Sequence, residues 1–134
     1  MVLQSSFVLD DNEHFFCLDT GRIITGKDLE YLLSILNSKL FFFSVGKFYG
    51  GGGLGAAGVR MKHTFFEKFQ CPTLPNLFSE SLVEIVNQIS EKRKKGENTS
   101  KNECEIDKIV YQLYSLNEDE IEAIENGINF INQL

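Results

Sequence analysis

The chain of 134 residues has little of what zinc sites, membrane spans and secretion signals require. Its three cysteines, Cys17, Cys71 and Cys104, form no Cys-x-x-Cys pair and have no histidine pair near them, so they lack zinc-ligand spacing. The longest apolar run, Leu40 to Phe43, is far too short to span a bilayer. Met1 is followed by a mixed polar sequence without the basic and apolar regions of a signal peptide. We therefore expect a soluble, cytoplasmic protein with reduced thiols and no membrane partner.

Catalytic signatures are missing as well. The two histidines, His14 and His63, lie far apart in the sequence, and no serine or cysteine motif frames either of them. Glu67 and Lys68 lack the intervening residue of a restriction-nuclease Glu-x-Lys pair. Nucleophilic and metal-dependent sites need such groups in a fixed arrangement. We therefore expect one non-catalytic domain, whose length allows one hydrophobic core.

The formal net charge of −6 argues against a nucleic-acid binder, but the charges are unevenly distributed. Residues 1–26 hold four acids and one base, residues 27–70 hold three acids and six bases, and residues 71–134 hold twelve acids and six bases. A basic stretch on an acidic chain favours contact with DNA through one face. An ordinary solvated face is the alternative.

Hydrophobic patterning predicts an α+β fold, in which a small sheet with a glycine-rich loop is followed by a helical C-terminal part. Ser6 to Asp10 and Glu13 to Leu18 flank a polar turn and are typical of two short strands in a hairpin. Leucines spaced by three and four residues between Leu29 and Leu40 predict an amphipathic helix that begins at Thr25 or Lys27. The stretch Val59 to Phe69 is rich in β-branched and aromatic residues, so we predict a further strand there.

Beyond residue 75 the sequence predicts helices only. Apolar residues spaced by three and four predict one helix over 77–95 and helices within 104–133. Asn117 and Glu120 have the spacing of a capping box and mark the start of the last helix. Residues 93–103 contain no hydrophobic side chain, so we predict a mobile linker over about this range.

A glycine-rich stretch, Gly50 to Gly58, contains six glycines. Residues 53–58 match the Gly-x-Gly-x-x-Gly pattern of dinucleotide sites, whose mechanism needs a following helix to take the pyrophosphate. A strand-like sequence follows instead, so a small enzyme that binds a nucleotide is kept only as an alternative. We interpret the glycines as permitting positive φ in a tight loop, or close backbone approach to a bulky partner.

Side chains near the glycines are of the types that grip and read DNA. Tyr49 offers an aromatic face, Arg60 offers a guanidinium that can pair with a base edge, and Lys62 can pair with phosphate. The full set of residues that we assign to DNA binding is Lys39, Lys47, Tyr49, Gly51, Gly52, Arg60, Lys62, His63 and Lys68.

Two segments resemble a known DNA-reading module. The first is Tyr31-Leu-Leu-Ser-Ile-Leu-Asn-Ser-Lys39, followed by the glycine-rich stretch and the exit Cys71-Pro-Thr-Leu-Pro75. The second is Glu105-Ile-Asp-Lys-Ile-Val-Tyr-Gln-Leu-Tyr-Ser-Leu-Asn-Glu-Asp-Glu-Ile121, with Ser115 where the family usually has glycine. In order and spacing they are similar to the C-terminal specificity domain of TaqI-like adenine-N6 DNA methyltransferases and of type II restriction-modification fusion enzymes.

The resemblance implies a single target-recognition domain over 1–134, with an α/β reading core at 1–75 and helical support at 76–134. Such a domain would hold double-stranded DNA while the catalytic domain of the same enzyme, with S-adenosylmethionine, flips and methylates an adenine. The only prolines are Pro72 and Pro75, so the chain has no Asn-Pro-Pro-Tyr-type motif, and we expect no cofactor and no catalysis in it. The alternative is an interaction module that docks a methyltransferase or restriction subunit through its acidic helices.

Overall fold

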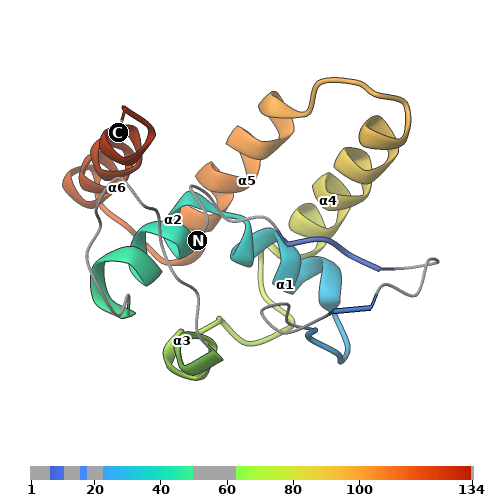
Figure 1. The fold of residues 1–134 in the computed structure, drawn as a ribbon, viewed down its shortest axis with the longest axis horizontal. Coiled ribbons are helices and arrows are strands. Elements are labelled where there is room, and N and C mark those ends of the chain that lie inside the picture. Colours follow the sequence, from blue (N-terminus) through green and yellow to red (C-terminus); the bar gives the residue numbers. More distant parts are fainter. Residues whose placement is uncertain (1–6, 11–15, 18–22, 50–62, 134) are drawn as a thin grey trace.

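Helices are the only regular structure in residues 7–10, 16–17, 23–49 and 63–133, which are the residues that the computed structural model describes (Figure 1). The elements before residue 50 are α1 (Leu29–Leu36), α2 (Lys39–Ser44) and a π-helical turn, η1 (Val45–Tyr49). The elements after residue 62 are α3 (His63–Lys68), α4 (Ser79–Lys94), α5 (Ser100–Leu113) and α6 (Glu118–Gln133). Helix α1 packs against α4, α2 packs against α5 and α6, and α4 packs against α5.

The hydrophobic core lies where the apolar faces of these helices meet. Five side chains in it are fully buried at 0% exposure, and they come from α1, α2, α4 and α5 and from the start of η1: Ile35, Phe41, Val45, Leu82 and Val110. Short helices are marginal alone in water, so their stability here comes from this shared packing. None of the helices within the described ranges combines the length and apolar character needed to cross a membrane.

The predicted sheet is wrong, because the described part of the chain contains helices and no strand. The predicted strand over Val59 to Phe69 includes α3 instead. Phe66 lies in α3 and Phe69 directly follows it, and both rings contact that of Phe41. The aromatic content favoured a strand, but β propensity mostly reflects packing context, and this context selects a helix.

The predicted hairpin also fails where the structure describes it, since residues 7–10 and 16–17 are not strands. The backbone of Phe7 pairs with a side chain rather than with a neighbouring strand. Its N–H donates to Oδ1 of Asn37 at 2.7 Å, and Nδ2 of Asn37 donates to the Phe7 carbonyl at 2.9 Å. One amide side chain thus satisfies both polar groups of this residue. The remaining residues of the predicted hairpin lie outside the described ranges.

The helix that was predicted to begin at Thr25 or Lys27 begins at Leu29, and Ser38 divides it into α1 and α2. The hydroxyl of this buried serine donates to the carbonyl of Ile35 at 2.6 Å and accepts from the N–H of Phe41 at 3.2 Å. Serine is a favoured helix N-cap because its oxygen satisfies an amide that has no partner within the helix. A second helix, α2, therefore begins at Lys39 instead of continuing α1.

The C-terminal helices agree with the sequence analysis. The N–H of Asn117 donates to Oε2 of Glu120 at 2.9 Å, and the N–H of Glu120 donates to Oδ1 of Asn117 at 2.9 Å, so the predicted capping box is confirmed. The linker was predicted too long, because α4 ends at Lys94 and α5 begins at Ser100. Across this turn Nζ of Lys92 donates to Oδ1 of Asn102 at 2.6 Å. The mobility of the turn stays a prediction.

Two of these helices end in the same way, with a residue in the left-handed backbone region. At the end of α4, Gly96 has φ 71° and its N–H donates to the carbonyl of Arg93. At the end of α5, Ser115 has φ 54° and its N–H donates to the carbonyl of Gln112. In both, the next N–H reaches back to the preceding turn, which completes a Schellman motif.

Candidate nucleic-acid interface

Both flanks of the segment 50–62 rest on one aromatic cluster. Helix α2 leads into the segment through η1. Its Phe41 ring lies 5.8 Å from that of Phe66, in α3 on the far side of the segment, and 4.9 Å from that of Phe69, which directly follows α3. The Phe7 ring adds edge-on contacts to Phe41 at 5.9 Å and to Phe66 at 5.8 Å. Such ring pairs add to the free energy of burial. The two flanks of the glycine-rich stretch are therefore held together.

The exit from α3 is held by a tyrosine from each of the two motif segments. The hydroxyl of Tyr31 donates to the carbonyl of Pro72 at 3.1 Å, and that of Tyr114 donates to the carbonyl of Gln70 at 2.7 Å. Nδ2 of Asn76 in turn donates to the Tyr31 oxygen at 2.9 Å. Burial raises the pKa of both tyrosines, so each stays a neutral donor.

A polar network joins the first motif segment to the last helices. Nζ of Lys39 lies 2.7 Å from Oε2 of Glu125, and the hydroxyl of Tyr111 donates to Oε1 of the same carboxylate at 2.8 Å. Burial raises the pKa of Glu125, but the hydrogen bonds from Lys39 and Tyr111 outweigh it, and the pKa is lowered overall. Burial opposes the ammonium of Lys39 too, yet the bond and charge of Glu125 raise its pKa. Both partners are therefore charged at neutral pH.

Asp107 is the buried carboxylate of this network. It is 8% exposed, and its Oδ1 accepts a 2.8 Å hydrogen bond from the backbone N–H of Lys39. Burial raises the pKa of Asp107 to about 6, although the N–H and the ammonium of Lys39 favour the charged form. We did not predict this role of Asp107. The one signal in the sequence is its position as an acid between the apolar Ile106 and Val110, which are both buried in α5.

Three lysines among the residues assigned to DNA binding have described side chains, and the structure places only two of them exposed beside the segment 50–62. Lys47 is exposed in η1, and Lys68 is exposed in the last turn of α3. These two lysines therefore lie on the two flanks of the segment 50–62. Lys39 differs from these two lysines, because its ammonium forms an ion pair with the carboxylate of Glu125.

The other assigned residues are described in part or not at all. Tyr49 ends η1 and His63 begins α3, so their backbones belong to helices. Gly51, Gly52, Arg60 and Lys62 lie outside the described residues, as does the whole Gly-x-Gly-x-x-Gly pattern. In the described ranges, no group of three or more histidine, cysteine, aspartate or glutamate side chains is arranged to hold a metal ion.

Comparisons of the chain with protein-family models, with curated proteins and with solved structures found no match.

Proposed function

We propose that the chain is the DNA target-recognition domain of an adenine-N6 methyltransferase or type II restriction-modification enzyme, without the catalytic part. The observation that carries this proposal is the mutual packing of the two motif segments around the flanks of the basic, glycine-rich stretch. Lys39 of the first segment binds Asp107 of the second, and the tyrosines of both hold the exit from α3. A scaffold that fixes both flanks of a reading segment suits recognition, because it lowers the entropy cost of binding.

Two details of the motif segments support the proposal. The polar residues of Leu36-Asn-Ser-Lys39 each have a partner within the domain, namely Phe7 for Asn37, Phe41 for Ser38 and Glu125 for Lys39. Ser115 stands where the family usually has glycine, and its φ of 54° is one that glycine adopts at low cost. The motif residues thus act as structural supports, while contact with DNA falls to the segment between them.

In this proposal the exposed Lys47 and Lys68 hold phosphates on either side of the segment 50–62, and Arg60 and Lys62 within it contact base edges and backbone. The catalytic domain of the same cytoplasmic enzyme would bind S-adenosylmethionine and carry out the methylation. The present chain would supply the recognition of the target site.

The test is binding to a library of duplex DNA at several salt concentrations. Three phosphate contacts, from Lys47, Lys62 and Lys68, give a slope of about −3 in log affinity against log salt. The double variant Lys47→Gln/Lys68→Gln should lower the magnitude of this slope to about a third. The matched control is Lys101→Gln/Lys108→Gln, which removes two exposed lysines of α5. Equal loss in the control, or no binding at about 50 mM salt, would contradict the proposal.

A further inference from the structure

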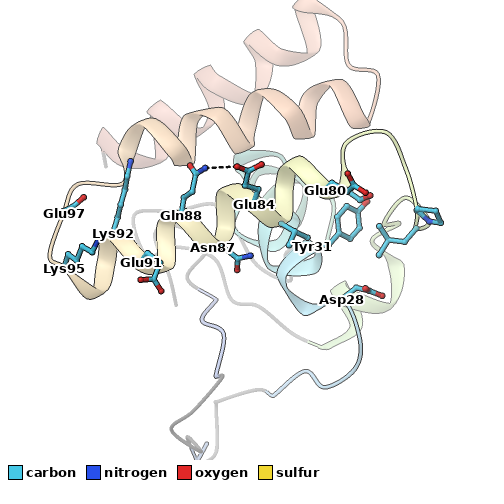
Figure 2. Close-up of a pocket in the computed structure, with 14 residues that line it drawn as sticks. Asp28, Tyr31, Glu80, Glu84, Asn87, Gln88, Glu91, Lys92, Lys95 and Glu97 are labelled. Atoms are coloured by element: carbon cyan, nitrogen blue, oxygen red, sulfur yellow. Dashed lines mark hydrogen bonds between the residues drawn. The ribbon is translucent and has the colours of Figure 1, made fainter.

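A groove with a volume of about 1050 Å³ runs along α4 (Figure 2). Its walls come from α1, from the residues just before α4 and from one side of α4 itself. Figure 2 shows Glu80, Glu84, Asn87 and Glu91 following one another along α4, with Tyr31 near one end. Lys47 and Lys68 do not line the groove.

Negative charge dominates the groove. Five carboxylates and two ammonium groups line it: Asp28, Glu80, Glu84, Glu91 and Glu97, against Lys92 and Lys95. Among the described residues only one of these acids has a cationic partner, since Oε1 of Glu91 lies 3.3 Å from Nζ of Lys94. Lys92 is turned towards Oδ1 of Asn102, which it reaches at 2.6 Å. The row of carboxylates along α4 is therefore mostly uncompensated.

The apolar residues of the groove gather at one end, where Asp28 and Glu80 also lie. Tyr31, Leu74, Pro75 and Val83 line it there, and Leu74 keeps 38% of its surface exposed. An exposed leucine beside a proline and a tyrosine ring offers a seat for one apolar side chain. The groove thus has a direction, because its apolar residues lie near the first turns of α4 while its carboxylates continue along the helix from Glu80 to Glu91.

We propose that this groove docks a basic amphipathic helix of another polypeptide. Glu80 to Glu91 spans about three helical turns, or roughly 16 Å, which fits lysines or arginines spaced by three and four on the face of a second helix. An apolar residue at one end of that helix would sit against Leu74 and Val83. DNA is a poor occupant, because the carboxylates repel phosphates. The site is separate from the proposed DNA contacts, so either proposal can fail alone.

The probe is a labelled peptide of about four helical turns, with a leucine in its first turn and arginines on the same face of the next three. A second peptide carries the same residues in reverse order, and a third is scrambled. Binding to the whole chain is measured by fluorescence anisotropy. We expect one of the two ordered peptides to bind, with affinity that falls as salt rises.

Two pairs of variants test the two parts of the groove. Glu80→Gln/Glu84→Gln should weaken binding about three- to tenfold. Its control, Glu118→Gln/Glu122→Gln, removes two exposed acids of the same spacing from α6 and should leave binding nearly unchanged. Leu74→Ala should weaken binding about tenfold. Its control is Leu77→Ala, at a leucine that is 87% exposed and lies outside the groove.

Several outcomes would overturn the proposal. Equal losses in the Glu80/Glu84 and Glu118/Glu122 variants would show attraction to net charge alone. No effect of Leu74→Ala would remove the apolar seat. Self-association of the chain that disappears in Glu80→Gln/Glu84→Gln would place a second copy of this chain in the groove. Loss of peptide binding in Lys47→Gln/Lys68→Gln would show that the peptide sits elsewhere.

Discussion

The backbone N–H of Lys39 donates a 2.8 Å hydrogen bond to the carboxylate of Asp107, and this bond joins two segments that lie 68 residues apart in the sequence. The same lysine reaches Glu125 of α6 with its side chain. The start of α2 is thereby fixed to both α5 and α6 through one residue. The side chains of the Lys39–Glu125 pair are 34% and 35% exposed, so water screens them and their attraction contributes below about 1 kcal/mol.

The first prediction concerns pH. The pKa of Asp107 is raised in the folded protein from 3.8 to about 6, so the folded state binds this proton more tightly than the unfolded state. The free energy of unfolding should therefore fall as pH rises from about 4 to about 6, by roughly 1 kcal/mol between pH 5 and 7. Asp107→Asn should remove this slope. Urea unfolding of both proteins at several pH values measures it.

The acids with lowered pKa values do not mask this effect. Glu103 and Glu125 stabilise the fold above their unfolded pKa of 4.5, and that stability is lost only as pH falls below it. Between pH 5 and 7 both are ionised in the folded and the unfolded state. The histidines titrate alike in both proteins, so subtracting the pH profile of Asp107→Asn from that of the native protein removes their contribution to the free energy of unfolding. Parallel pH profiles for the two proteins would refute the prediction.

A second prediction uses the two Schellman motifs. The φ of 54° strains the backbone of Ser115, because its Cβ disfavours the left-handed region. Ser115→Gly should therefore raise the free energy of unfolding by about 1 kcal/mol. Gly96→Ser should lower it by a similar amount, because a Cβ there meets no atom within 4 Å and only the φ of 71° opposes it. Thermal unfolding of the two variants and their double combination provides the measurement. A loss of stability in Ser115→Gly would show that the serine side chain matters more than its backbone.

The third prediction concerns the contact of α6 with α2. A Cβ at Gly127 would lie 2.6 Å from Cε2 and 2.8 Å from Cδ2 of Phe43. Gly127→Ala should therefore destabilise the protein by about 1–2 kcal/mol, although alanine is the better helix former. In a Phe43→Leu background the same substitution should become neutral or stabilising. If Gly127→Ala costs the same in both backgrounds, the ring is not the obstacle.

The fourth prediction separates contacts with base edges from contacts with phosphates in the full methyltransferase that we propose. Arg60→Ala should relax sequence preference at one base pair by about 1–3 kcal/mol, because a guanidinium can pair with both O6 and N7 of guanine. Lys68→Ala should weaken all sequences alike, since an ammonium on a flexible stem suits phosphate. Methylation of a library of single-base site variants distinguishes the two. An unchanged preference profile in an active Arg60→Ala enzyme would remove Arg60 from base reading.

Periodicity predicted the helices that have a single apolar face. The stripe containing Leu82 and Ile85 matches α4, and the capping box at Asn117 marks where α6 begins. These signals are local, so the sequence carries them directly. The strands failed because the aromatic residues of α3 are set by their contact with Phe41, which is distant in the sequence. Tertiary packing of this kind overrides local propensity.

The candidate sites were predictable to different degrees. The single lysines on either side of the glycine-rich stretch are visible in the sequence, whereas the pairing of Lys39 with Glu125 depends on how α2 meets α6. The acidic groove was also missed, because Asp28 and Leu74 come next to Glu80 only in the folded chain. The composition therefore predicted that these helices are acidic, but it could not predict which surface of the fold carries the acidic side chains.

The aromatic cluster also sets how far the glycine-rich stretch can reach. A chain from residue 50 to residue 62 has a contour of at most roughly 45 Å, and with both flanks held near each other its midpoint can stand no farther than about 22 Å from them. The major groove is about 8.5 Å deep, so the reach suffices only when the flanks themselves sit close to the duplex. In the DNA recognition that we propose, Lys47 and Lys68 would contact phosphates on either side and so set the height of the segment 50–62 above the bases. A much shorter segment could not enter the groove.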